Sequence, residues 1–232
     1  KGIVTGSPKK IPVWQKRYNI PDKNVYNYEN MHTMSNNPDI DIVYIVLPNA
    51  LHKEYTIVGA NAGKHVWCEK PMAMNVQECR EMINACQKNK VQLTIGYRMQ
   101  HEPVTQTIIG WRKTKPYGDI NTVLAEAGFY NSAGDPSHWK LHKELGGGAM
   151  MDMGVYPLNA ARYMTGLEPV AVSARTEFTR PDLFKADERT IFQLEFEEGI
   201  TASCKTSFAD RVNTLKVNCE RGWYQLRPFQ AY

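Results

Sequence analysis

The sequence predicts an α/β domain with a parallel sheet, followed by an α+β domain with a large, mostly antiparallel and open sheet. Residues 42–47 form an apolar run without alternation, which is typical of a strand covered on both faces. Strands alternate with helices up to about residue 97, whereas after Gly118 strand-like segments follow one another with few helices between them. We therefore expect a domain boundary near Gly118, with residues 1–117 in the first domain and residues 118–232 in the second.

The first domain is expected to consist of βαβ units. Gly63 ends the helix that follows the central apolar strand, because glycine readily adopts the left-handed conformation found after a helix. Asn75 begins another helix, and Glu78 follows three residues later in a capping-box pattern. Strands are expected at residues 3–5, 42–47, 65–68 and 92–97, and helices at residues 8–18, 49–62 and from 75 onward.

The second domain is expected to be dominated by strands. Residues 197–199 are a hairpin turn between two of them. The segment 190–196 carries apolar and polar residues on both of its faces, so a sheet with helices on one face has another face to cover. Strands are expected at residues 121–130, 170–178, 190–196, 200–208 and 215–219.

Composition excludes several classes of protein. The net charge of +4 is small and spread along the chain, which argues against a nucleic-acid partner and suits an anionic small molecule. The apolar runs are too short to cross a membrane. The six histidines include no H-E-x-x-H or similar ligand pair, so no metal is expected.

The cysteines are read as small buried hydrophobic residues without a disulfide or metal role. No two of them form a C-x-x-C pair, and their odd number leans towards a reducing compartment. A cytoplasmic location is therefore favoured, and a periplasmic one stays open because any export signal would precede the first residue. The five cysteines are Cys68, Cys79, Cys86, Cys204 and Cys219.

The first chemical motif is Glu69-Lys70-Pro71. A residue before proline is pushed away from the helical conformation, so Lys70 is expected to be extended just beyond a parallel strand. That edge of an open α/β sheet is where ligands bind. An ammonium group held there can orient a hydroxyl group or move a proton, but an ordinary strand-to-helix turn with solvated charges fits the motif equally well.

The second motif extends from Gly146 to Tyr156 and opens with three glycines. If the segment is helical, Asp152 and Tyr156 share one face. A carboxylate and a phenol on one face suit proton transfer at a hydroxylated substrate. Pro157 would either kink the helix or lie in the first turn of a new one. The alternative is a glycine-rich loop that caps a core helix, with Tyr156 half-buried.

The motifs occur in an order and spacing that resembles the Gfo/Idh/MocA oxidoreductases. Tyr156, with Trp139 and Lys140 before it, is most similar to the glucose-fructose oxidoreductase branch. The resemblance implies a Rossmann dinucleotide-binding domain and a substrate domain with an open sheet. The motifs that carry it are residues 47–52, Glu69-Lys70-Pro71, Gly96-Tyr97-Arg98, residues 117–120 and residues 146–156.

The resemblance also implies roles for individual residues. Lys70 and Tyr156 match residues that handle the proton of the substrate hydroxyl, with Asp152 beside them. The expected cofactor-binding residues are Thr5, Gly6, Ser7, Lys10, Pro48, Asn49, His52, Glu69, Lys70 and Arg98. Among them, Glu69 is matched to the nicotinamide side. The expected substrate-binding residues are Tyr97, Trp139, Lys140, Asp152 and Tyr156.

One motif of the family is missing, since no G-x-G-x-x-G occurs in the sequence. In related proteins it lies on the first βα turn, before the strand with which this chain opens. We therefore expect that the first strand and the glycine-rich loop are absent from the sequence, and that the second domain is incomplete at its C-terminus.

The resemblance implies an oxidoreductase that moves a hydride between NADP or NAD and a sugar-like CH–OH group. NADP is slightly favoured, because Thr5, Ser7 and Lys10 stand where NAD-specific proteins usually place an acidic residue. An NAD-dependent glycoside hydrolase of the same fold and a non-catalytic regulator remain alternatives, although Lys70, Asp152 and Tyr156 argue against the regulator. The expected partners are a sugar-like small molecule and a second copy of the chain, as a homodimer or homotetramer through the open sheet face, with no nucleic acid and no membrane.

Overall fold

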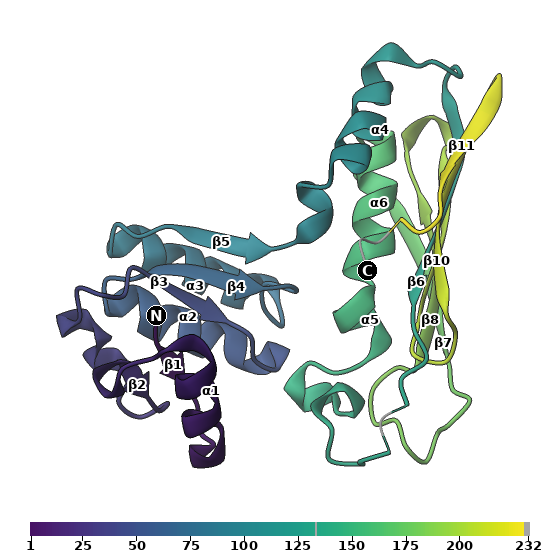
Figure 1. The fold of residues 1–232 in the computed structure, drawn as a ribbon. Coiled ribbons are helices and arrows are strands. Elements are labelled where there is room, and N and C mark those ends of the chain that lie inside the picture. Colours follow the sequence, from purple (N-terminus) through teal and green to yellow (C-terminus); the bar gives the residue numbers. More distant parts are fainter. Residues whose placement is uncertain (133, 230–232) are drawn as a thin grey trace. The chain divides into compact units, whose positions relative to one another are not determined.

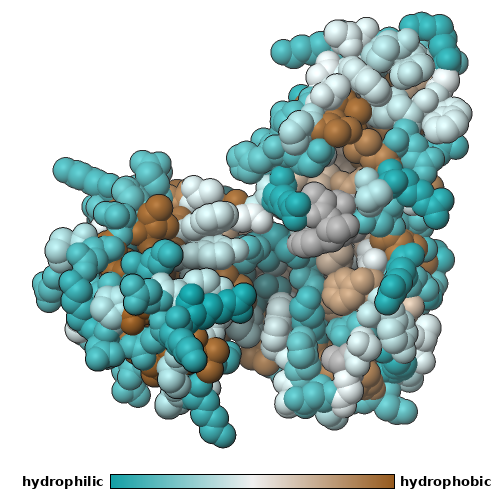
Figure 2. All heavy atoms as spheres, in the orientation of Figure 1, coloured by the Kyte–Doolittle hydropathy of each residue, from teal (hydrophilic) through white to brown (hydrophobic). Residues whose placement is uncertain are grey.

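The computed structural model describes residues 1–132 and 134–229. The chain divides into two compact units, Lys1–Gly96 and a second unit from Tyr97 onward (Figure 1). Packing separates these units about twenty residues before Gly118. The domain boundary expected near Gly118 stays a prediction. Figure 2 shows mainly polar side chains on the visible face of each unit, with apolar ones scattered among them.

The first unit contains parallel strands in two groups. Strand β1 pairs with β2, and β3, β4 and β5 form a three-stranded sheet in that order. A 3-10 turn at Pro8–Lys10 leads into α1, with Pro12 in its first turn. The elements are β1 Ile3–Val4, α1 Ile11–Tyr18, β2 Val25–Tyr26, β3 Ile42–Ile45, α2 His52–Asn61, β4 His65–Glu69, α3 Val76–Lys88 and β5 Leu93–Gly96.

The three-stranded sheet is covered on one face. Val43, Ile45, Val66 and Cys68 point to a core shared with α2 and α3. On the other face, Ile42 is 58% exposed and Tyr44 is 50% exposed. Among the described residues, this strand is therefore covered on one face only, and the expectation of cover on both faces is wrong. The strand is apolar on its exposed face as well, and an apolar run does not reveal whether its second face is covered.

Helix α3 begins as its sequence predicts. The Asn75 side chain accepts a hydrogen bond from the Glu78 backbone N–H at 2.9 Å. The Glu78 carboxylate reaches back to the backbone N–H of Met74 at 3.1 Å. Met82 and Cys86 are buried on the face that packs against the sheet and α2.

The second unit is a six-stranded sheet in the order β11-β10-β6-β9-β8-β7. The β6–β9 pair is parallel and the other pairs are antiparallel, which confirms the expected mostly antiparallel sheet. Helix α4 and strand β11 were not anticipated. The elements are α4 Pro103–Thr114, β6 Ile120–Gly128, α5 Ala149–Met153, α6 Val155–Thr165, β7 Ala171–Glu177, β8 Arg189–Glu195, β9 Thr201–Ser207, β10 Val212–Cys219 and β11 Gly222–Leu226.

Helices α4, α5 and α6 lie along one face of this sheet (Figure 1). Val123, Ala125 and Ala127 of β6 point to that face and are buried. The opposite face carries polar side chains, including an ion pair of 3.0 Å between Glu126 and its register neighbour Lys205. The core of the unit therefore lies between the helices and one face of an open sheet.

In the part of the chain that the structure describes, no helix combines the length and apolarity needed to cross a bilayer.

Candidate functional site

The carboxyl ends of β3 and β4 position the first group of predicted site residues. Glu69 is the last residue of β4, Lys70 follows it directly, and the peptide bond between Lys70 and Pro71 is cis. The loop Leu47–Asn49 follows β3, which pairs in parallel with β4. Both loops therefore lie at the ligand-binding edge of a parallel sheet. Lys70 is half-buried there.

His52 connects these two loops. The residue is fully buried, and its ring nitrogens lie 2.8 Å from the Pro71 carbonyl oxygen and 3.0 Å from the Leu47 carbonyl oxygen. Both partners are acceptors, so a neutral imidazole with a single N–H can donate to only one of them. The structure thus places His52 behind the loops, where it holds their backbones. Direct contact of His52 with a cofactor stays a prediction, as it does for Pro48 and the buried Asn49.

The end of β1 carries the residues expected at the adenosine ribose. Thr5 is buried, and its hydroxyl accepts a hydrogen bond from the Ser7 backbone N–H at 3.1 Å. A Cβ atom on Gly6 would lie 3.1 Å from the Tyr28 ring, so a side chain there would crowd that ring. Lys10 is exposed at the end of the following 3-10 turn. No carboxylate occurs in residues 1–21, so hydroxyl groups and ammonium groups dominate this turn.

In the second unit, the glycine-rich segment is held by Asp187, which lies just before β8. Its backbone oxygen accepts from Ala149 N–H at 2.9 Å, and its carboxylate accepts from Met150 N–H at 2.7 Å and from the Thr190 hydroxyl at 2.8 Å. Gly148 has φ of 101°, and a Cβ atom on it would lie 2.1 Å from the Asp187 carboxylate. Burial raises the pKa of Asp187.

Asp187 therefore caps α5 from a distant segment, and sequence reasoning missed it. The residue lies 37 positions from Met150. No local capping pattern reveals such a partner.

Asp152 and Lys140, both predicted at the substrate, form an ion pair of 2.7 Å. Asp152 is buried on α5, which the Asp187 cap holds in place. The Lys140 ammonium group lies 5.0 to 5.8 Å from the ring centres of Phe129, Trp139 and Phe208. Such cation–π contacts keep the ammonium in place beside the carboxylate.

Tyr156 lies in the first turn of α6, which begins anew at Val155 after a break at Gly154. Pro157 thus lies in the first turn of a new helix, as one of the two alternatives expected. Tyr156 is 2% exposed, more deeply buried than the half-buried residue of the alternative interpretation. It stacks on Tyr97 with ring centres 5.7 Å apart.

Tyr97 in turn donates a hydrogen bond to the Val155 carbonyl at 3.2 Å. Burial raises the pKa of the Tyr97 hydroxyl. Arg98, expected at the cofactor, begins the short 3-10 helix that follows Tyr97. The second unit therefore holds the five residues predicted to line the substrate site in two groups, one of Asp152, Lys140 and Trp139 and one of Tyr156 and Tyr97.

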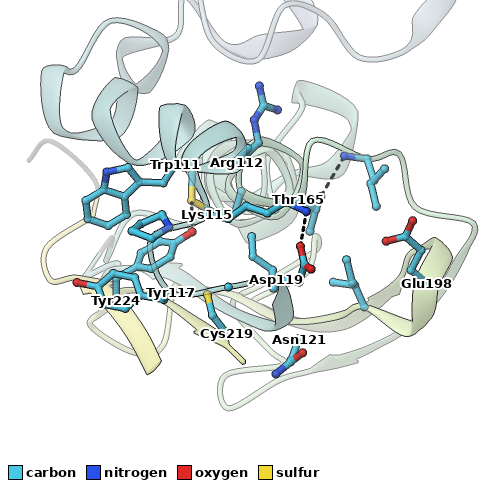
Figure 3. A pocket seen from close by; sticks show the side chains of 16 residues that line it. Trp111, Arg112, Lys115, Tyr117, Asp119, Asn121, Thr165, Glu198, Cys219 and Tyr224 are labelled. Carbon is cyan, nitrogen blue, oxygen red and sulfur yellow. Dashed lines mark hydrogen bonds and ion pairs between the residues drawn. The ribbon is translucent and has the colours of Figure 1, made fainter. Parts of the chain in front are cut away.

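A cavity of about 290 Å³ lies elsewhere in the second unit, at the C-terminal ends of α4 and α6 (Figure 3). None of the predicted site residues lines it. Lys115 forms an ion pair with Asp119, and Trp111, Tyr117 and Tyr224 pack against one another on one side. These groups satisfy each other, and we assign no chemistry to this cavity.

Among the described residues, no three His, Cys, Asp or Glu side chains gather as a metal site would require. All five cysteines are free, and all but Cys79 are buried. Burial raises the pKa of the Cys68 thiol to about 12, so that thiol is not poised for reaction.

Comparison with known proteins agrees with this division of the chain. A family model described as an oxidoreductase family with an NAD-binding Rossmann fold matches residues 1–97, and a model of the GFO/IDH/MocA C-terminal domain matches residues 106–225. The crystal structure of aldose-aldose oxidoreductase from Caulobacter crescentus, complexed with glycerol, superposes with a TM-score of 0.92 at 40% identity. It covers 100% of this chain, which in turn covers 69% of that protein.

Curated relatives are similar over most of this chain. D-xylose 1-dehydrogenase [NADP(+)] of Haloarcula marismortui is 34% identical over 78% of the chain and 51% of its own length. 1,5-anhydro-D-fructose reductase of Ensifer adhaerens is 28% identical over 75% of the chain and 52% of its own length. The chain spans about half the length of the curated relatives it matches.

We expect His52→Ala to lower the free energy of unfolding by about 2 kcal/mol or more, since a carbonyl oxygen loses its donor and the fully buried ring leaves a cavity between the two loops. Urea denaturation followed by circular dichroism measures this change. His32→Ala is the control, because that histidine contacts the Glu29 carbonyl at the surface. Equal, small losses for both variants would contradict the role given to His52.

Proposed function

The chain belongs to the GFO/IDH/MocA oxidoreductase family, and from that premise we propose that it moves a hydride between NADP or NAD and a sugar or sugar derivative. The reacting group is a hydroxyl or carbonyl group of the substrate. The similarity of the whole chain to aldose-aldose oxidoreductase at 40% identity carries this proposal. A xylose dehydrogenase and an anhydrofructose reductase among the relatives support the same substrate class.

The first unit supplies the cofactor-binding residues in this proposal. Thr5, Gly6, Ser7 and Lys10 fit the adenosine ribose, because the turn offers hydroxyl groups and an ammonium group and no carboxylate. A phosphate on the 2′-hydroxyl of the ribose suits such a turn better than a bare hydroxyl does. Pro48, Asn49, Glu69 and Arg98 are proposed to complete the site. When bound, the cofactor accepts or supplies the hydride.

The residues of this chain handle the proton of the substrate hydroxyl. We assign Lys70 to polarise the hydroxyl oxygen, and Tyr156 to relay the proton that leaves it during oxidation. Asp152 accepts hydrogen bonds from other hydroxyl groups of the sugar, and its ion pair with Lys140 fixes the direction in which the carboxylate points. Tyr97, beside Tyr156, and Trp139, beside Lys140, are proposed to line the substrate site.

Lys70→Ala and Tyr156→Phe are each expected to lower kcat by about 100- to 10,000-fold, the usual contribution of a positioned acid–base group. Cofactor binding should persist in both variants. Steady-state kinetics with aldoses and NADP measure kcat, and net reduction of NADP rather than release of sugar identifies a dehydrogenase. Tyr163→Phe is the control on the same helix, since its hydroxyl bonds to Gln100. A near-normal kcat with a raised KM in Tyr156→Phe would make Tyr156 a binding residue only.

NADP is expected to bind more tightly than NAD, and Lys10→Ala should remove most of that preference, because an exposed ammonium group is lost at the proposed 2′-phosphate position. Isothermal titration of both cofactors on the intact natural protein measures the ratio. Lys16→Ala, also exposed and on α1, should leave the ratio unchanged. The preference for NADP is wrong if NAD binds at least as well and Lys10→Ala does not alter the ratio.

We also propose that the protein assembles as a homodimer or homotetramer through the open face of the six-stranded sheet. That face presents Leu124 and Ile191 among polar side chains and the Glu126–Lys205 ion pair. Light scattering on the intact protein should give at least twice the monomer mass, and Leu124→Arg should shift the equilibrium towards monomer by placing an unpaired charge in the interface. A concentration-independent monomer mass for the unsubstituted protein would contradict this assembly.

A further inference from the structure

We propose that Tyr44 is a positioning residue that sets the orientation of the Glu69 carboxylate for the nicotinamide end of the cofactor. This inference rests on the proposed function, in which Glu69 contacts that part of the cofactor. It concerns three neighbouring strands of the first unit and depends on contacts within that unit only.

The register of β3 and β4 brings the tyrosine within reach of the carboxylate. Tyr44 pairs with Trp67, and Glu69 lies two residues further along β4, on the same face of the sheet. The Tyr44 and Trp67 rings pack with centres 4.7 Å apart and planes inclined by 32°. Because this packing restrains the ring, the Tyr44 hydroxyl is held where it donates a hydrogen bond to Oε1 of Glu69.

On its other side, Glu69 lies next to a glycine, which leaves space for the carboxylate. Gly96 is the register partner of Glu69 on β5. A Cβ atom at that position would lie 3.1 Å from Oε1 of Glu69 and 3.2 Å from Nε1 of Trp67. The glycine therefore leaves room for the carboxylate to lie across β5, and the tyrosine hydroxyl selects one orientation within that room.

The Tyr44 side chain lies outside the core of the first unit. The tyrosine side chain is half exposed, on the face of the sheet opposite the core formed by Val43 and Ile45. Its hydroxyl donates a hydrogen bond to the Glu69 carboxylate, and hydrogen bonds to an ionised acceptor are among the stronger ones.

The two contacts leave Glu69 able to bind a further donor. Oε1 accepts from Tyr44, and Oε2 accepts from the Lys70 backbone N–H at 3.3 Å. A carboxylate has about four lone-pair sites, so sites remain for an amide N–H donor. A carboxamide group, such as that of nicotinamide, is a donor of this class. The same contacts also fix the peptide that carries Lys70.

The test compares two probes on the intact protein, NADP and 2′-phospho-ADP-ribose, which lacks the nicotinamide ring. Tyr44→Phe removes only the hydroxyl and keeps the ring on Trp67. We expect it to weaken NADP binding by about three- to tenfold, as for loss of one charge-assisted hydrogen bond at a half-exposed site, and to leave the affinity for the ring-less probe unchanged. Tyr18→Phe, an exposed tyrosine of the same unit, is the control.

A double-mutant cycle with Glu69→Gln separates this inference from the proposed function. If Tyr44 acts through Glu69, Tyr44→Phe should add little to the loss caused by Glu69→Gln. Equal weakening of both probes by Tyr44→Phe would show a merely structural role and overturn the inference. So would a normal NADP affinity in Tyr44→Phe when Glu69→Gln is impaired. If Glu69→Gln itself binds NADP normally, the role assigned to Glu69 in the proposed function fails instead.

Discussion

The parallel pairing of β3, β4 and β5 is the constraint on which the first unit depends. Parallel strands end at one edge of a sheet, so the loops that follow β3 and β4 leave the sheet side by side. His52 can join their backbones only because both loops start there. The same register places Tyr44, Trp67 and Glu69 on one face of the sheet. Gly96 lies beside Glu69 and leaves room for its carboxylate. The position proposed for Lys70 thus depends on strand register as well as on the local turn at Pro71.

In the second unit, a side chain from a distant segment, rather than strand register, positions the predicted site residues. There a buried carboxylate, Asp187, satisfies the backbone N–H groups at the start of α5, and Gly148 gives it the space to approach. Free N–H groups at a helix start need such an acceptor. With the helix start fixed, Asp152 is presented to Lys140, whose ammonium group is surrounded by three aromatic rings.

Local patterns in the sequence predicted what local physics decides. The cap at Asn75 and the turn at Lys70-Pro71 are set by residues near each other in the chain, and both were predicted. The new helix containing Pro157 was one of two alternatives that the sequence left open. Asp187 and Tyr44 were missed because their partners lie far away in sequence. The exposed face of β3 was misjudged because an apolar run looks the same whether or not its second face is covered. The assignment of residues to the cofactor and the substrate follows from the family resemblance, because binding roles leave no local pattern in the sequence.

Strand β7 ends the six-stranded sheet and pairs only with β8 among the described residues. Its outer edge therefore presents a row of backbone donors and acceptors that another chain could extend into a continuous sheet, which is the usual origin of edge-to-edge aggregation. Nearly all of its side chains are exposed, and most of them are small and uncharged. Arg175 and Glu177, paired with each other at the end of the strand, are the charges that oppose such growth. Edge-to-edge association of the protein is therefore expected to depend on this short strand and on its few charges.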